Sequence, residues 1–109
     1  MLDGKSVAVV VPAYNEERFI REVIETMPSF VDKIIVVNDG STDNTREVIE
    51  LAADQDSRVQ PLHQEENRGL GQSLIDGYLE SRRLEMDVVA VMAGDGQMAP
   101  GDLKPIVLP

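Results

Sequence analysis

The stretch VVNDGSTDNT, residues 36–45, decides how the rest of the chain is interpreted, because an apolar run ends there in an Asp-Gly turn. Residues 33–37 (KIIVV) are β-branched and nearly continuous, which is typical of a parallel strand buried on both faces. Gly40 supplies the backbone freedom for the turn, and residues 42–44 are candidate N-caps of a helix running to about residue 53. Ligands of open parallel sheets bind beyond the carboxyl ends of the strands, so Asp39 stands where a binding group is expected.

The same alternation of strand and helix recurs on both sides of this stretch. Residues 6–11 (SVAVVV) and residues 87–92 (DVVAVM) are further apolar runs, the first of them stopped by Pro12. Residues 58–62 (RVQPL) form a weaker strand, which Pro61 places at a sheet edge. Strands joined to helices by short loops imply βαβ units. We therefore predict an α/β fold, a Rossmann-like parallel sheet with flanking helices in the strand order 3-2-1-4.

Apolar residues at helical spacing predict the helices between these strands. Asn15 can cap a helix that Pro28 closes and whose apolar face consists of Phe19, Ile20, Val23, Ile24 and Met27. A later amphipathic helix ends near Arg83 and is marked by Leu70, Leu74, Ile75, Tyr78 and Leu79. Residues 100–107 resemble the start of one more helix.

Composition limits the class of protein. A chain of 109 residues suits one small domain, and its net charge of -10 argues against nucleic acid or an anionic membrane surface as a partner. Cysteine is absent, which fits a reducing compartment, and His63 is the sole histidine, so a zinc site built on imidazoles is not expected. No apolar run reaches the ~20 residues of a membrane span. We expect a soluble, cytoplasmic protein with no transmembrane segment.

The predicted strand order brings three strand tips to one crevice: residues 12–15, 38–41 and 93–97. Two of these tips carry an aspartate, Asp39 and Asp95, with little competing positive charge nearby. Such a crevice suits a donor-rich base edge at one carboxylate and a divalent cation at the other.

These tips also carry a family resemblance. The matching stretches are VVVPAYNEE (9–17), VVNDGSTDNT (36–45), ENRGLGQSLIDGY (66–78) and AGDGQM (93–98). They resemble the amino-terminal half of the family 2 glycosyltransferases, which have the GT-A fold and use nucleotide-diphosphate sugars. Within the family, the chain is most similar to enzymes that load sugar onto polyprenyl phosphates.

The resemblance implies roles for individual residues. It implies that the nucleotide sugar is held by Pro12, Ala13, Tyr14, Asn15, Glu16 or its neighbour Glu17, Asp39, Gly40, Ser41, Arg68, Gly94 and Asp95. Asp39 would accept a hydrogen bond from a ring N–H of uracil or guanine, for which an ionised carboxylate is the right acceptor. Asp95 would bind Mg²⁺ or Mn²⁺, which bridges the diphosphate. Arg68 would meet a phosphate, and the backbone N–H groups of residues 67–69, which open the third helix, would add donors.

Two features depart from the family pattern. Ala93 stands at the first position of the usual Asp-X-Asp metal motif, which leaves Asp95; one carboxylate, substrate phosphates and waters can still hold Mg²⁺. Family members also continue with an acceptor-binding half, whereas this chain ends at Pro109. We therefore expect one nucleotide-sugar-binding domain, residues 1–109, a partial GT-A fold whose transfer activity alone is weak or absent.

Simpler interpretations stay open beside this one. Asp39 and Asp95 can be turn residues that bind nothing, and His63 can be an ordinary strand-end histidine. In another class of function, the chain is a non-catalytic module that forms a homo-oligomer. This alternative rests on the fourth strand lying at an exposed sheet edge, where unpaired backbone groups favour association.

Overall fold

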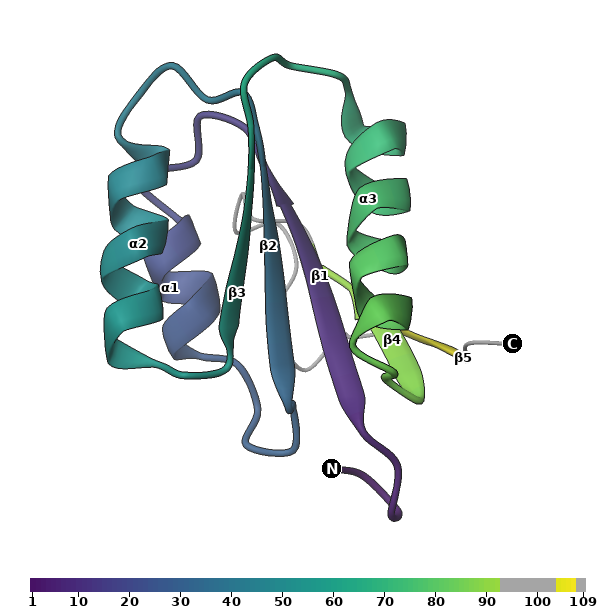
Figure 1. The fold of residues 1–109 in the computed structure, drawn as a ribbon. Helices are drawn as coiled ribbons and strands as arrows, with labels where there is room; N and C mark the ends of the chain where they lie inside the picture. The colour runs from purple at the N-terminus through teal and green to yellow at the C-terminus, as the bar shows by residue number, and fades with distance from the viewer. Residues whose placement is uncertain (93–103, 108–109) are drawn as a thin grey trace.

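The computed structural model describes residues 1–92 and the backbone of residues 104–107. Within them the elements are β1 (Val7–Ala13), α1 (Ile20–Glu25), β2 (Lys33–Asp39), α2 (Thr45–Gln55), β3 (Val59–Gln64), α3 (Leu70–Arg83), β4 (Val88–Val91) and β5 (Lys104–Val107). The strands form one sheet in the order β3-β2-β1-β4-β5, and β1 to β4 run parallel (Figure 1). The predicted fold class and strand order are confirmed, with β3 at an edge.

The strand β5 corrects two predictions. Residues 104–107 are a strand that pairs antiparallel with β4, with Pro105 opposite Ala90, and do not continue a helix. The reason is local: proline favours an extended residue before it and lacks the N–H that a helix interior needs, but an edge strand tolerates it. The prediction that β4 is an edge strand is also wrong, so the observation behind the self-association alternative is removed.

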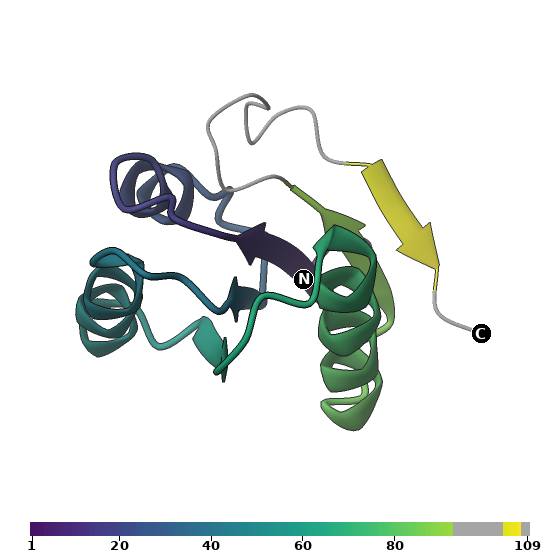
Figure 2. The same ribbon diagram turned by 90° about the horizontal axis from the view of Figure 1, so that it is seen from above.

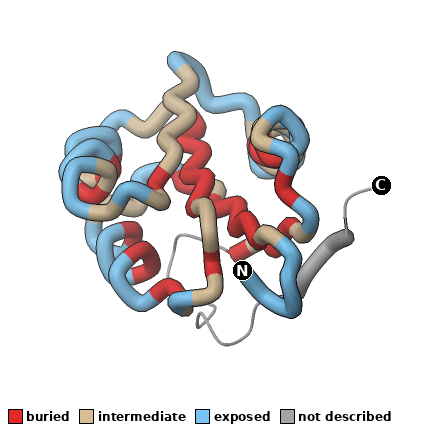
Figure 3. Tube along the Cα trace, turned by 60° about the horizontal axis from the view of Figure 1, so that its bottom comes forward, coloured by how far each residue is buried: buried red, intermediate tan, exposed pale blue. Residues whose placement is uncertain are grey.

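Helices cover both faces of the sheet. Figures 1 and 2 show α1 and α2 on one face and α3 on the other. Alternate strand residues supply each layer: Val9, Val11, Ile34 and Val36 pack with α1 and α2, whereas Ala8, Val10, Ile35 and Val37 face the α3 side. Burial on both faces explains why these strands are continuous apolar runs, and Figure 3 shows the buried residues concentrated along them.

The helix α3 lies unusually close to the sheet. Its buried residues are Ser73, Gly77 and Ser81, and a Cβ added at Gly77 would lie 2.3 Å from a methyl carbon of Val10. The helix is therefore where the sequence predicts it, but its inward face is made of small residues. Three of the leucine and isoleucine side chains that marked the helix are mostly exposed instead, namely Leu70 (63%), Ile75 (52%) and Leu79 (53%).

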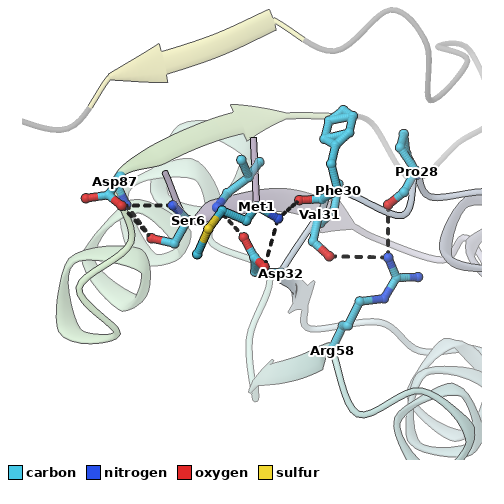
Figure 4. A network of polar contacts seen from close by, with 9 residues as sticks. Met1, Ser6, Pro28, Phe30, Val31, Asp32, Arg58 and Asp87 are labelled. Carbon is cyan, nitrogen blue, oxygen red and sulfur yellow. Dashed lines mark hydrogen bonds and ion pairs between the residues drawn. The ribbon is translucent and has the colours of Figure 1, made fainter. Parts of the chain in front are cut away.

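Polar contacts connect the amino ends of the strands, at the opposite end of the sheet from residues 12–15 and 38–41 (Figure 4). The carboxylate of Asp32 accepts the Val7 N–H at 2.7 Å, joining β2 to β1. The carboxylate of Asp87 accepts the Ser6 N–H at 2.8 Å, joining β4 to β1. Arg58 donates to two carbonyl oxygens before β2, those of Pro28 and Val31. In the described part of the chain, no helix is long and apolar enough to cross a membrane.

We predict that Gly77→Ala lowers the free energy of unfolding by about 1–3 kcal/mol, because the added methyl group overpacks the contact with buried Val10. Urea denaturation followed by circular dichroism measures the change. Gly71→Ala is the matched control on the same helix, since a Cβ there meets nothing within 4 Å. This control should gain up to about 1 kcal/mol from helix propensity. Equal effects of the two substitutions would contradict the close packing of α3.

We also predict that stability falls at acid pH through the strand-end carboxylates. The Val7 N–H, aided by the amino terminus, lowers the pKa of Asp32 below its ordinary 3.8, and the Ser6 N–H lowers the pKa of Asp87 likewise. A carboxylate whose pKa is lower in the folded than in the unfolded state stabilises the fold at pH values above the unfolded-state pKa. This stabilisation is lost as the pH falls through the folded-state pKa. Urea midpoints from about pH 6 to about pH 3 should therefore fall less steeply in Asp32→Asn than in the wild type. Asp54→Asn, an exposed α2 change, should keep the wild-type slope.

Candidate functional site

The carboxylate of Asp39 fastens the loop before α3 to the tip of β2. This residue ends β2 and is 4% exposed. Its Oδ1 accepts the Arg68 N–H at 2.7 Å and its Oδ2 accepts the Gly69 N–H at 2.9 Å. Each carboxylate oxygen has two lone pairs, so the group can accept a further donor from a ligand. Asp39 is thus both a structural clamp and an available acceptor.

Gly40 makes this clamp sterically possible. It has a φ of +69°, and a Cβ at this position would lie 2.4 Å from the backbone nitrogen of Asn67. A side chain would therefore clash with the loop as well as strain the turn. The position requires glycine because two backbone segments cross there, which the sequence motif alone does not reveal.

Asn15 links the tip of β1 to the loop before α2. Its Oδ1 accepts the backbone N–H of Thr42 at 2.8 Å and of Asp43 at 3.3 Å, and its own N–H donates to Ser41 Oγ at 3.0 Å. The prediction that Asn15 caps α1 is wrong, since that helix begins at Ile20. Asn15 has a φ of +52°, which turns the chain out of β1 several residues before the helix starts.

Asp43 supplies the polar contact at the start of α2. The N-cap residue Asn44 makes no side-chain capping bond, whereas Asp43 Oδ1 accepts the Thr45 N–H at 2.9 Å and also the Thr45 hydroxyl. Burial acts to raise the pKa of Asp43, but the hydrogen bonds from Thr45 outweigh it and lower the pKa. Thr45 Oγ1 in turn accepts the Glu16 N–H at 2.9 Å, which is a second link between the two tips.

A hollow of about 220 Å³ opens between the two tips and the start of α3. Its walls are Pro12, Ala13, Tyr14, Asp39, Asn67, Gly69, Leu70 and Ser73. A larger hollow of about 350 Å³ lies between α1 and α2, but its charged side chains are already paired, Arg21 with Glu25 and Asp56 with Arg58. The smaller hollow combines a half-exposed aromatic ring, Tyr14, with a buried carboxylate, and is the better candidate for a ligand site.

The structure brings most of the predicted site residues together. Pro12, Ala13, Tyr14 and Asp39 line the hollow; Asn15, Glu16, Gly40 and Ser41 form the turns around it. Arg68 is exposed, and its guanidinium makes no hydrogen bond or ion pair within residues 1–92. Gly94 and Asp95 lie outside the described residues, and within the described ones no cluster of three or more possible metal ligands occurs.

Four further lining residues are Asn67, Gly69, Leu70 and Ser73, of which Leu70 and Ser73 were not predicted. The backbone N–H groups of residues 67–69 were expected to meet a phosphate, but those of Arg68 and Gly69 are donated to Asp39. All four lining residues belong to the stretch ENRGLGQS, residues 66–73, which follows the edge strand β3 and includes the first turn of α3. This motif can be recognised in the sequence, but only the close approach of α3 to the sheet shows which residues of the motif reach the hollow.

His63 supports the turn at Asp39 from the next strand. The Ser41 N–H donates to Asn38 Oδ1 at 3.2 Å, so Asn38 Nδ2 faces His63 Nδ1 at 3.0 Å. An amide nitrogen only donates, hence Nδ1 accepts and the proton of the neutral ring lies on Nε2, which contacts Glu50 Oε1 at 2.8 Å. The histidine that the sequence left without a role therefore holds Asn38, whose side chain holds the turn.

We predict that His63→Leu lowers the free energy of unfolding by about 1–3 kcal/mol, because Asn38, 3% exposed, loses the acceptor of its amide. Glu50→Gln should cost under about 1 kcal/mol, since its side chain is 52% exposed. Urea denaturation compares the two, and ¹⁵N NMR at neutral pH should find His63 Nδ1 unprotonated. A protonated Nδ1 in the neutral ring would refute this hydrogen-bond chain.

The chain matches known proteins along almost its whole length. A family model described as glycosyl transferase family 2 matches residues 8–109. A UDP-N-acetylglucosamine–dolichyl-phosphate N-acetylglucosaminyltransferase of Methanococcus voltae is 30% identical over 118 residues, covering 96% of this chain and 47% of the relative. A dolichyl-phosphate β-glucosyltransferase of Trichomonas vaginalis is 37% identical over 98 residues, covering 80% of this chain and 28% of that protein. The chain thus spans less than half the length of either relative.

Solved structures agree on the fold. Glucosyl-3-phosphoglycerate synthase of Mycobacterium tuberculosis, in complex with Mn²⁺, UDP and glucosyl-3-phosphoglycerate, matches with a TM-score of 0.65 and 25% identity over 84% of this chain and 34% of its own. A mannosyltransferase of Pyrobaculum calidifontis, in complex with GDP-mannose and Mn²⁺, matches with a TM-score of 0.71 and 23% identity over 84% of this chain and 28% of its own. The sheet order, the covered motifs and the family model agree, and the chain belongs to glycosyl transferase family 2.

Proposed function

We propose that this domain binds a nucleotide-diphosphate sugar, a UDP- or GDP-sugar, for sugar transfer to an acceptor. The observation that carries the proposal is the buried Asp39 carboxylate beside the Tyr14 ring in a hollow at the carboxyl ends of β1 and β2. Crevices at this position are where open α/β sheets bind their ligands. One relative and one solved neighbour, whose name and title include UDP, support a UDP-sugar as the donor.

The base of the nucleotide is the part that suits this hollow. A phosphate would be repelled by Asp39, whereas a ring N–H can donate to it. Uracil and guanine carry such a ring N–H, and the neutral forms of cytosine and adenine do not. Tyr14, 44% exposed, offers an aromatic face for stacking. The base would therefore sit against Asp39 and Tyr14 and direct the diphosphate toward the tip of β4.

A divalent cation, Mg²⁺ or Mn²⁺, held by Asp95 and the diphosphate, would neutralise the charge that develops on the leaving group. The guanidinium of Arg68, which is exposed at the start of α3, can meet a phosphate oxygen. The Mn²⁺ in the two solved complexes supports a divalent cation for the domain.

The transfer we propose is inverting, by direct displacement at the sugar carbon. We take a polyprenyl phosphate as the acceptor, because dolichyl phosphate stands in the names of two relatives. A phosphate oxygen is already ionised near neutral pH, so such an acceptor needs no general base. In this proposal residues 1–109 form the donor-binding part, and this chain spans 47% of the length of the Methanococcus voltae relative.

Calorimetric titration of UDP and GDP, each with and without Mn²⁺, tests the proposal. One nucleotide should bind, and Asp39→Asn should weaken it about tenfold or more through loss of a charge-assisted hydrogen bond. Asp54→Asn, which removes the same charge from the exposed face of α2, should bind as the wild type does. Absence of binding by both nucleotides at millimolar concentration would overturn the proposal.

Methylated nucleotides separate ligand contact from the structural role of Asp39. N3-methyl-UDP or N1-methyl-GDP lacks the ring N–H, and should bind the unchanged protein about as weakly as the natural nucleotide binds Asp39→Asn.

Asp95→Asn should remove the part of the affinity that depends on Mn²⁺. A transfer assay with a polyprenyl phosphate then distinguishes an active donor domain from a module that only binds.

A further inference from the structure

Ser73 carries a buried hydroxyl that the fold does not use. Its side chain is 0% exposed, and its Oγ has no hydrogen-bond partner among the described residues. Burying a hydroxyl without a partner costs free energy, and such groups are rare in native proteins. A partner supplied by a ligand would explain this one.

Ser81, two turns further along the same helix, shows how a serine in this setting is normally satisfied. It is also 0% exposed, and its Oγ donates to the carbonyl oxygen of Gly77 at 2.9 Å, four residues earlier. The equivalent carbonyl for Ser73 is that of Gly69, which accepts the Ser73 backbone N–H at 3.1 Å but not its hydroxyl. The difference lies in the surroundings, since Ser73 lines the hollow at the strand tips and Ser81 does not.

The hollow places Ser73 beside the group that would take the base. Asp39 and Ser73 line the same 220 Å³ space, and Gly69 is bonded to both, since its N–H donates to Asp39 Oδ2 and its carbonyl oxygen accepts the Ser73 N–H. A base that donates its ring N–H to Asp39 has a carbonyl group on the adjacent ring carbon, both in uracil and in guanine. The wall offers three neutral side-chain donors to that oxygen, those of Tyr14, Asn67 and Ser73, and of these only the Ser73 hydroxyl is fully buried and without a partner among the described residues.

We propose that the Ser73 hydroxyl donates a hydrogen bond to the base carbonyl next to the ring N–H, and so completes a two-point reading of an oxo-base with Asp39. The inference rests on the proposed function, because it assigns a specificity residue within the same site. It assigns to α3 a direct part in choosing the base, in addition to its role in packing against β1.

The test is the affinity of Ser73→Ala for UDP and GDP, with Ser81→Ala as the matched control. Ser73→Ala should bind about two- to tenfold more weakly, the value of one neutral hydrogen bond, and its thermal midpoint without nucleotide should not fall, since no bond within the fold is lost. Ser81→Ala should keep wild-type affinity and should lose some stability, because its hydroxyl is bonded to Gly77.

Thio-substituted nucleotides identify the atom that is read. Sulfur is a weak acceptor, so 2-thio-UDP or 4-thio-UDP, or 6-thio-GDP if guanine is the base, should bind the wild type more weakly than the oxo form. Ser73→Ala should bind the oxo form and that thio form equally.

The outcomes separate the two claims. No nucleotide binding by the wild type overturns the proposed function and this inference with it. Binding that Ser73→Ala leaves unchanged, or that it weakens equally for oxo and thio forms, overturns the role of Ser73 alone. A loss of affinity in Ser81→Ala as large as in Ser73→Ala would assign the effect to helix packing, and would also overturn it.

Discussion

The rest of the site depends on one buried carboxylate. Asp39 ends the interior strand β2, and its two oxygens each accept a backbone N–H from the loop that precedes α3. That arrangement is possible because Gly40 leaves room for the loop to cross. The tip of one strand and the start of a helix about 30 residues later are thereby held as a unit. A ligand that donates to Asp39 meets an acceptor whose position is already fixed before binding.

The packing of α3 determines what else lies in the hollow. Small residues on its inner face let the helix approach β1 until Gly77 meets Val10, and the same face carries Ser73 to the wall beside Asp39. A helix with large inward residues would stand further from the sheet and leave the serine out of reach of the strand tips. The same geometry explains why Ile75 and Leu79 are exposed. Small residues occupy the face of α3 that contacts the sheet, so these two larger side chains lie on the other side of the helix.

The sequence was sufficient for the four parallel strands and their order, and insufficient for β5 and for the contacts at the strand tips. Continuous apolar runs such as residues 7–11 predict buried parallel strands directly, since both faces are covered. The inner face of α3 could not be predicted, because an apolar periodicity indicates a hydrophobic face and a close helix–sheet contact needs small residues instead. Asn15 was misassigned for a related reason: its residue type suits a helix cap, but its partners are backbone groups about 27 residues away. The sequence held a signal for the strand β5 that the helix prediction for residues 100–107 did not use, because Pro105 disfavours a helix interior and is tolerated in an edge strand.

Charge explains why the two ends of the proposed ligand need different partners. The chain has a net charge of -10, and Glu65 and Glu66 are exposed in the loop that carries Arg68. A neutral base edge can approach Asp39 at no electrostatic cost, because it brings donors and no charge. A diphosphate brings negative charge to a surface that is already negative, and one exposed guanidinium at high dielectric offsets little of it. The base end of the ligand can therefore be bound by this chain's own groups, whereas the proposed diphosphate end depends on an added cation.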